Sequence, residues 1–349
     1  MNRKPYVSIL IPIRNEAAYI ERCLDAVLHQ DYSGEMECLV ADGMSTDATR
    51  QIVEAYRQRY PNFHIIDNPG KIVPTGLNRL IPLAKGDIII RVDGHCEIAA
   101  DYVSKCVAHL QTDNVDGVGG PMVTIGETPL AEVIATSMSS PFGVGNSAFR
   151  TISAKTMLAD SVPFPAYTRK IIEKVGLYDE ELVRNQDDEY NYRLREFGGK
   201  LLLAADVRSK YYSRGSLHKL WRQYFQYGLY KVRVLQKHPR QMSLRQFVPP
   251  AFVLALLASA LLAAIPAVRW LSLAVPTAYL AANLGASVLT ALRAKKSNRS
   301  PLSAHYFLLP IAFAILHLSY GLGFLLGLFK FWNRWGDKQG KVPAISFND

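Results

Sequence analysis

Asp87-Ile-Ile-Ile-Arg-Val-Asp93-Gly-His95 is the stretch that decides the fold, because a run rich in β-branched residues ends on a carboxylate and an imidazole two positions apart. The run predicts a buried strand at 88–92. In an open α/β sheet, ligands bind beyond the carboxyl ends of the strands, which is where Asp93 and His95 would lie. A carboxylate with a neutral imidazole suits Mn²⁺ or Mg²⁺, and such an ion commonly holds a diphosphate. The alternative is that Asp93 caps the next helix and His95 is a surface loop residue.

Strands and helices alternate over residues 1 to 125. The hydrophobic pattern predicts strands at 6–13, 36–41, 63–66, 88–92 and 118–123, and helices at 17–29, 48–60, 75–84 and 101–111. Repeated βα units indicate an α/β fold with a doubly wound, mainly parallel sheet. The later pattern is less regular, but it predicts a helix at 187–197 and a strand at 200–205.

Polar side chains cluster where three of these strands end. In chain order they are Pro12, Asn15 and Glu16, then Asp42, Ser45, Thr46 and Asp47, and then Asp93 and His95. Because parallel strands end at the same edge of a sheet, all three clusters should share one rim. Asp42 suits a hydrogen bond to a nucleobase or ribose, whereas Ser45, Thr46 and Asp47 suit the cap of the following helix.

The hydrophobic residues, 49% of the 349-residue chain, are unevenly distributed. Three runs contain no Asp, Glu, Lys or Arg, namely 247–268, 270–292 and 300–329. Each run can cover the ~20 residues of a bilayer-spanning helix. Three such runs in succession are hard to bury in a soluble core, so we expect about three transmembrane helices in 247–330.

The formal charge of +10 is concentrated in residues 208–246, which hold ten Lys or Arg and no Asp or Glu. Tyr, Trp and Phe are interleaved with these cations. A basic aromatic segment directly before an apolar run suits an anionic cytoplasmic leaflet, so membrane lipids are the expected partner. Single-stranded nucleic acid is the competing partner, and the adjacent membrane helices argue against it.

Positive charge also predicts the orientation of the helices. The block at 208–246 and the cluster at 293–299 should both be cytoplasmic. A third complete span would then place the tail, 331–349, outside, yet the basic residues of that tail favour the inside. The last run is therefore either a bent or re-entrant hairpin or an exception to the positive-inside rule. The first apolar run, 7–13, is too short for a secretory signal, which predicts a cytosolic N-terminal region with reduced cysteines.

Five stretches together carry a family resemblance. They are Ser8–Glu16, Val40–Asp47, Gly76–Asn78 with Ala84–Gly86, Arg91–His95 and Asn185–Leu194. In order and spacing, over residues 5 to about 235, they resemble the membrane-anchored family 2 inverting glycosyltransferases, hexosyltransferases that have the nucleotide-sugar-binding GT-A fold. The similarity is greatest to the branch that assembles bacterial exopolysaccharides such as succinoglycan.

The resemblance implies roles for particular residues. The usual metal motif of the family is Asp-x-Asp, and the departure at His95 favours Mn²⁺. The base is expected among Gln186, Asp187, Asp188 and Glu189, where alignment on Arg193-Leu194 selects Asp187 and keeps Asp188 as the alternative. Without the family context, this acidic cluster would be a solvated helix start. The implied donor site comprises Pro12, Asn15, Glu16, Asp42, Asn78 and Asp93, with Asp42 on the nucleobase and Asp93 and His95 on the divalent ion.

The implied function is transfer of one sugar, with inversion, from a nucleotide-diphosphate sugar, such as UDP-glucose, to a polyprenyl-diphosphate-linked saccharide in exopolysaccharide or cell-surface glycan assembly. One carboxylate base and one ion suffice for that chemistry. The alternatives are a metal-dependent sugar-nucleotide hydrolase and a non-catalytic, membrane-tethered nucleotide-sugar binder.

The implied organisation follows the chain. Residues 1–207 would form a GT-A catalytic domain in the cytoplasm, 208–246 a membrane-interface segment, 247–330 the transmembrane helices, and 331–349 a basic tail. The expected location is the plasma (inner) membrane of a bacterium, as a multi-pass protein.

Overall fold

The computed structural model describes residues 3–145, 147–151, 154–213, 215–296, 304–338 and 340–345. It divides into two compact units. The first, here called the α/β unit, comprises Met1–Val123, Ile152–Tyr211 and Gln339–Asp349. The second, here called the helical unit, comprises Thr124–Thr151 and Tyr212–Lys338. This division by packing assigns 124–151 to the helical unit. The functional boundaries implied by the sequence, at 207/208, 246/247 and 330/331, stay predictions.

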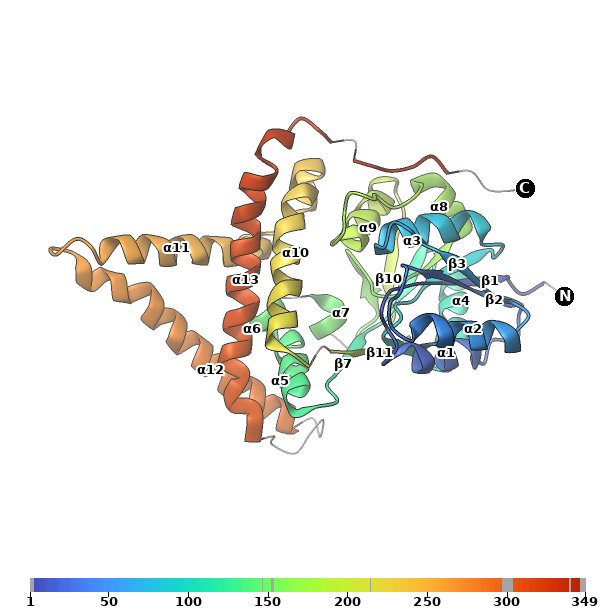
Figure 1. Cartoon of the computed structure of the whole chain (residues 1–349), viewed down its shortest axis with the longest axis horizontal. Coiled ribbons are helices and arrows are strands. Elements are labelled where there is room, and N and C mark those ends of the chain that lie inside the picture. The colour runs from blue at the N-terminus through green and yellow to red at the C-terminus, as the bar shows by residue number, and fades with distance from the viewer. Residues whose placement is uncertain are drawn as a thin grey trace. The chain divides into compact units, whose positions relative to one another are not determined.

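The α/β unit is built on an eight-stranded sheet of order β3-β2-β1-β4-β9-β6-β10-β8 (Figure 1). Four strands pair in parallel at one end, namely β1 (Val7–Ile13), β2 (Met36–Asp42), β3 (Phe63–Asp67) and β4 (Ile88–Arg91). The other end contains β6 (Gly117–Gly119), β8 (Met157–Leu158), β9 (Ala166–Thr168) and β10 (Leu201–Leu203). Here β9 runs antiparallel to its two neighbours and β10 is parallel to β6. The predicted mainly parallel sheet is confirmed.

Helices cover both faces of this sheet. Helices α1 (Ile20–Leu28) and α2 (Thr49–Arg59) lie on one face and α3 (Val73–Leu80) on the other (Figure 1). Further along the chain come α4 (Tyr102–Thr112), α8 (Arg169–Val175) and α9 (Gln186–Glu196). All seven residues of β1 are buried, as expected for a strand covered on both faces. Helix α1 buries Ile20, Cys23, Leu24 and Val27, which share one face at helical spacing.

One predicted strand is two strands in the structure. The stretch 118–123 forms β6 in the main sheet and β7 (Met122–Ile125) in a second sheet of order β5-β11-β7. The strand is interrupted at Gly120-Pro121. Gly120 lies against the backbone of Val207, where a Cβ would meet a carbonyl oxygen, and Pro121 has no N–H to donate to a neighbouring strand. The other two strands of this sheet, β5 (Cys96–Ile98) and β11 (Ser209–Tyr212), pair antiparallel.

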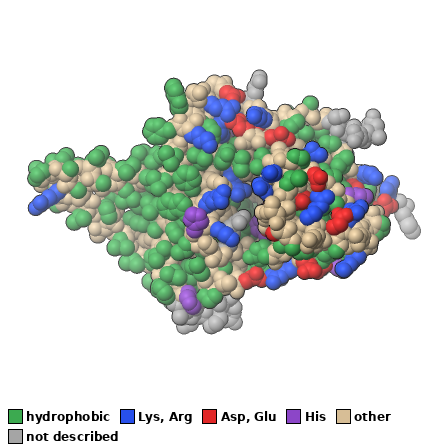
Figure 2. Space-filling view, viewed as in Figure 1, with side chains coloured by type: hydrophobic (Ala, Val, Ile, Leu, Met, Phe, Trp, Pro, Cys, Tyr) green, Lys and Arg blue, Asp and Glu red, His purple; other side chains and the backbone are tan. Residues whose placement is uncertain are grey.

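The helical unit contains α5 (Pro129–Met138), α6 (Pro141–Val144), α7 (Ala148–Thr151), α10 (Leu217–Lys237), α11 (Val248–Leu262), α12 (Ala274–Lys296) and α13 (Leu309–Lys330). Three stretches, Leu244–Leu262, Arg269–Ala294 and His305–Lys330, are long and apolar enough to cross a membrane. Hydrophobic side chains dominate the surface of these helices (Figure 2). The three long apolar helices expected near the C-terminus are therefore present.

The basic aromatic segment is mostly one helix, α10. It buries Leu220, Tyr224, Gly228 and Val232, which are spaced by four residues and therefore lie on one face. This face packs along α13, and the two helices lie side by side (Figure 1).

Candidate active site

The ends of the first two strands are tied together by hydrogen bonds. The backbone N–H of Asn15 donates to Ser45 Oγ (2.9 Å), and Asn15 Oδ1 accepts from the N–H of Thr46 (2.8 Å). The N–H of Glu16 donates to Thr49 Oγ1 at the start of α2 (2.8 Å). Asn15 has a left-handed backbone (φ 56°), which few residues other than glycine and asparagine adopt easily. The two polar clusters therefore form one rigid rim.

Asp42, the predicted nucleobase contact, is only 3% exposed. Its Oδ1 accepts from the N–H of Ser45 (3.1 Å) and from Ser45 Oγ (2.6 Å), and its Oδ2 lies 3.4 Å from the Arg50 guanidinium. Asp47 accepts from the N–H of Thr49 (3.0 Å), the first residue of α2, although the N-cap position of that helix is occupied by Ala48. Pro12 is buried within β1, where its side chain faces Gly76 of α3.

Arg91, the last residue of β4, joins two of the predicted site residues. Its Nη2 lies 2.5 Å from Asp93 Oδ1 and its Nη1 lies 2.7 Å from Asp187 Oδ2. The Arg91 side chain is 6% exposed, so the two ion pairs compensate the cost of burying its charge. The guanidinium therefore brings the end of β4 and the first turn of α9 together.

Asp187 presents one carboxylate oxygen without a partner. Its Oδ2 is held by Arg91, whereas its Oδ1 is buried and has no hydrogen bond to any described residue. Burial raises the pKa of Asp187 above its usual value, and the positive charge of Arg91 opposes that rise. An oriented carboxylate with one unpaired oxygen is suited to accept a proton. Asp188, the alternative base, is half-buried.

His95 is oriented by a carboxylate. Its Nδ1 lies 3.0 Å from Glu16 Oε1, and its ring makes an edge contact with Tyr211 of β11 at a centroid distance of 5.0 Å. A proton on Nδ1 that is donated to Glu16 leaves the lone pair on Nε2, which is how a carboxylate commonly orients a metal-binding imidazole. This contact gives Glu16 an orienting role that was not predicted from the sequence.

The donor set of Asp93 and His95 fits a divalent ion that is shared with substrate. Within the described ranges, no three His, Cys, Asp or Glu side chains converge, so no site there would hold an ion by three such protein ligands. Mg²⁺ and similar ions are commonly held by one or two protein ligands plus phosphate oxygens, so two ligands suit an ion that arrives with a diphosphate. The residues present therefore fit the predicted Mn²⁺ or Mg²⁺.

Asn78, predicted in the donor site, is committed to the loop that precedes α9. Its amide donates to the carbonyl of Tyr178 (2.8 Å) and to Glu180 Oε1 (3.0 Å), and its Oδ1 accepts from the N–H of Tyr178 (2.8 Å). Tyr178 stacks on Tyr190 of α9 at a centroid distance of 4.1 Å. These contacts make Asn78 a support for the helix that begins with Asp187.

Within α9, Glu189 and Arg193 form a buried ion pair of 2.6 Å. Arg193 also donates to the carbonyls of Val175 and Leu177. Glu189 therefore positions Arg193 against the loop that follows α8. Arg91 was not predicted as a site residue, although an arginine inside a buried strand is itself a signal, because such a charge needs a partner.

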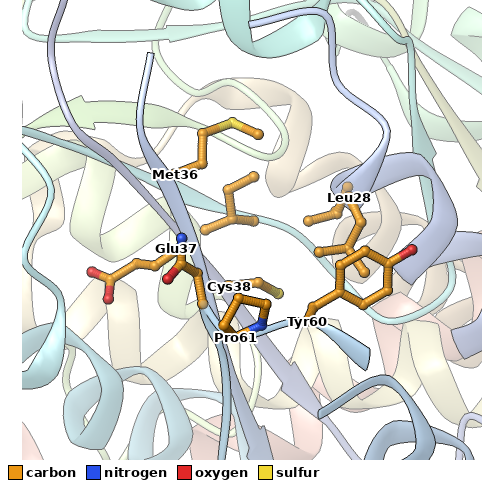
Figure 3. A pocket seen from close by; sticks show the side chains of 9 residues that line it. Leu28, Met36, Glu37, Cys38, Tyr60 and Pro61 are labelled. Atoms are coloured by element: carbon orange, nitrogen blue, oxygen red, sulfur yellow. The ribbon is translucent and has the colours of Figure 1, made fainter. Parts of the chain in front are cut away.

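A cavity of about 170 Å³ lies elsewhere in the α/β unit. Its lining includes Leu28, Met36, Cys38, Tyr60 and Pro61 (Figure 3). Met36 is the first residue of β2, so this cavity lies at the opposite end of the strands from the polar rim. It is not part of the candidate active site.

The chain is similar to known proteins. The family model described as Glycosyl transferase family 2 matches residues 8–176. The chain is 31% identical over 328 residues to the succinoglycan biosynthesis protein ExoA of Rhizobium meliloti (strain 1021), covering 93% of this chain and 96% of that protein. It is 28% identical over 334 residues to the dolichyl N-acetyl-α-D-glucosaminyl phosphate 3-β-D-2,3-diacetamido-2,3-dideoxy-β-D-glucuronosyltransferase of Methanococcus voltae, covering 93% and 98%.

Among solved structures, the mannosyltransferase PcManGT from Pyrobaculum calidifontis, in complex with GDP-Man and Mn²⁺, has a similar fold. The TM-score is 0.57 at 20% identity, and the match covers 93% of this chain and 88% of that one. This likeness establishes the GT-A-like fold. Together with 31% identity to ExoA over nearly the full length of both chains, it leads to one conclusion: the protein belongs to glycosyltransferase family 2.

Proposed function

We propose that this glycosyltransferase moves one sugar, with inversion, from a UDP-sugar such as UDP-glucose to a polyprenyl-diphosphate-linked saccharide in exopolysaccharide or cell-surface glycan assembly. The observation that carries the proposal is the double ion pair of Arg91 with Asp93 and Asp187. Through it, the expected metal ligand and the expected base flank one guanidinium, so that a diphosphate and an acceptor hydroxyl can be held side by side.

In the proposed reaction, Asp187 Oδ1 takes the proton of the acceptor hydroxyl while Arg91 holds Oδ2. The acceptor oxygen forms a bond to the anomeric carbon from the face opposite the diphosphate. The bond from that carbon to the diphosphate oxygen breaks, and its electron pair leaves with the nucleoside diphosphate. A divalent ion bound by Asp93 and His95 would neutralise the charge on the departing group.

The names of the two relatives support a glycan product and a lipid-linked acceptor. One is named for succinoglycan biosynthesis and the other for transfer to a dolichyl-linked sugar phosphate. The long apolar helices would hold the enzyme in a bacterial plasma membrane, with residues 1–207 as the cytoplasmic catalytic domain, 208–246 at the interface, and the acceptor's lipid tail in the bilayer.

The test incubates membranes that contain the full chain with a panel of labelled UDP- and GDP-sugars and Mn²⁺, followed by lipid extraction. We expect label from one UDP-sugar to enter the organic phase only when lipid-linked acceptor is present. Release of free labelled sugar without any lipid product would instead identify a hydrolase. Donor binding without any turnover would identify a non-catalytic binder and overturn the proposal.

A further inference from the structure

The C-terminal tail returns to the α/β unit. The N–H of Glu180 donates to the carbonyl of Lys341 (2.9 Å), and the N–H of Lys341 donates to Asp179 Oδ1 (2.8 Å). Asp179 is 1% exposed, and the described tail residues 340–345 belong to this unit. The tail and the α/β unit must therefore lie on the same side of any membrane that the chain crosses.

This contact restricts the topology of everything between Tyr211 and Gly340. Both residues belong to the α/β unit, so the intervening chain crosses a membrane an even number of times. Among the described residues of that interval, three stretches are long and apolar enough to span. Three complete crossings and no others would place the tail on the opposite side from the α/β unit, which the contact with Asp179 contradicts.

Helix α13 differs from the other two in its surroundings. Protein buries 44% of its most apolar window, against 17% for α11 and 11% for α12. Two of its glycines lie against the backbone of α10, because a Cβ on Gly323 would lie 2.1 Å from the Phe225 carbonyl oxygen and one on Gly327 would lie 2.7 Å from that of Leu229. The two helices run in the same direction in backbone contact, so α13 can cross a bilayer only if α10 crosses with it.

Helix α10 is poorly suited to cross. It contains five Lys or Arg and no Asp or Glu. A cation that faces lipid at the bilayer centre is costly, and Lys219 and Arg222 of α10 are exposed. The last turns of the pair also carry polar contacts, since the buried guanidinium of Arg233 donates to the carbonyls of Arg334 and Asp337 (both 3.3 Å). Gln236 donates to the carbonyl of Phe331 (2.7 Å). Of the α10 cations, the exposed Lys219 and Arg222 can face headgroups, whereas Lys231, Arg233 and Lys237 are buried against protein. We therefore expect this pair to lie at the membrane surface.

Helices α11 and α12 project away from that pair (Figure 1). The apolar stretch that includes α11 has 19 residues, which as a helix is about 28 Å long, close to the ~30 Å thickness of the hydrocarbon core. Its leucines are lipid-accessible, with Leu257 54% and Leu261 73% exposed. Cations flank the hairpin at both bases, with Arg245 before α11 and Arg293 in the last turn of α12, as the positive-inside rule requires for ends on the same side.

We infer that α11 and α12 insert as a two-helix hairpin, whereas α13 lies with α10 at the membrane surface on the side of the catalytic unit. The chain crosses twice, and its tail stays on that same side. The third apolar run is thus a surface helix, and the basic tail obeys the positive-inside rule without an exception.

Four single-cysteine variants of the full chain test this topology. Gln58→Cys reports the α/β unit, Ala267→Cys the α11–α12 turn, His305→Cys the short turn that precedes α13, and Ala344→Cys the tail; all four parent residues are exposed. The native thiols of Cys23, Cys38, Cys96 and Cys106 are buried, so the parent chain gives the background. Sealed membrane vesicles of known orientation are labelled with a membrane-impermeant maleimide before and after opening with detergent.

We expect positions 58, 305 and 344 to share one labelling pattern and position 267 alone to show the opposite one. If 344 follows 267, all three apolar helices cross. If 305 and 344 differ, α13 crosses. If all four agree, the hairpin does not insert. Each of these three results overturns the inference, and each variant is checked for folding by its elution from gel filtration in detergent beside the parent chain.

Discussion

The unpaired Oδ1 of Asp187 distinguishes this carboxylate from its neighbour Asp188. We expect Asp187→Asn to lower turnover by about 10²- to 10⁴-fold, the usual contribution of a general base, while donor affinity changes little. Asp188→Asn should cost much less and serves as the matched control. Initial rates of lipid-linked product and direct donor binding measure the two effects. If the variants exchange behaviours, the base is Asp188, and if neither loses more than about tenfold, α9 does not supply the base.

The contact of Glu16 with His95 makes a separate prediction about the ion. Removing the charge in Glu16→Gln weakens the orientation of the imidazole, and loss of such a partner typically costs about 10- to 100-fold in metal affinity. We expect Mn²⁺ to bind that much more weakly, as measured by electron paramagnetic resonance of free Mn²⁺ in the presence of UDP. Glu54→Gln, at a partly exposed glutamate of α2 that pairs with Arg57, is the control. Equal affinity in both variants would show that Glu16 does not support a metal ligand.

At the scale of elements, the tail is bound to the loop that leads into α9 through the backbone N–H and carbonyl of Lys341. Lys341→Pro removes the N–H that donates to the buried Asp179, whereas Lys341→Ala keeps it. We expect the proline variant to lose about 1–3 kcal/mol of unfolding free energy and the alanine variant less than about 0.5 kcal/mol. Thermal unfolding of the purified full chain measures both. Equal losses would mean that the Lys341 side chain, and not the hydrogen bond, matters.

Helix α4 is tied by His109, whose Nδ1 lies 2.6 Å from Asp113 Oδ2 and whose Nε2 lies 2.9 Å from Asp206 Oδ1. Burial lowers the pKa of His109, but the two carboxylates raise it by more than burial lowers it, so the pKa in the folded protein is above the usual value. The hydrogen bonds from His109 lower the pKa of both Asp113 and Asp206, with partial burial opposing the shift at Asp206.

The His109 contribution to stability is therefore complete below the unfolded pKa of about 6.5 and is lost as pH rises through the higher folded pKa. The carboxylate contribution is present above an unfolded pKa of about 3.9 and is lost on acidification. We expect this cluster to stabilise most between these values. His109→Gln should remove the loss of stability that occurs as pH rises above about 6.5. Urea unfolding at mildly acidic and at alkaline pH would detect this as a smaller difference between the two midpoints.

At the scale of the whole molecule, electrostatic and apolar attachment to a membrane predict different responses to salt. High salt reduces the Debye length to about 3 Å and screens contacts between the cations of α10 and anionic lipid. The apolar surface of α11 and α12 is unaffected by screening. We expect the full chain to stay in the membrane pellet through a high-salt wash and to leave it only in detergent. Release by salt alone would contradict insertion of the hairpin.

Much of the fold could be predicted from local patterns. The alternation of strands and helices over residues 1 to 125 predicted the mainly parallel sheet, and three uncharged runs predicted the long apolar helices. The second sheet was not predicted, because β5 and β11 are short and pair Ile98 with Ser209 across more than a hundred residues of sequence. Such pairing depends on the folded chain and not on local preference.

The sequence by itself determined the family, the strand-end position of the polar clusters, and the acidic start of α9, since periodicity and motif spacing act over a few residues. Only the tertiary structure decided that Arg91 joins Asp93 to Asp187 and that Asn78 supports a loop. It also decided that the tail returns to Asp179. These contacts join groups that are distant in the sequence and buried in the folded protein. A buried charge or hydrogen-bonding group must have a partner, and the local sequence does not specify which distant group that partner is.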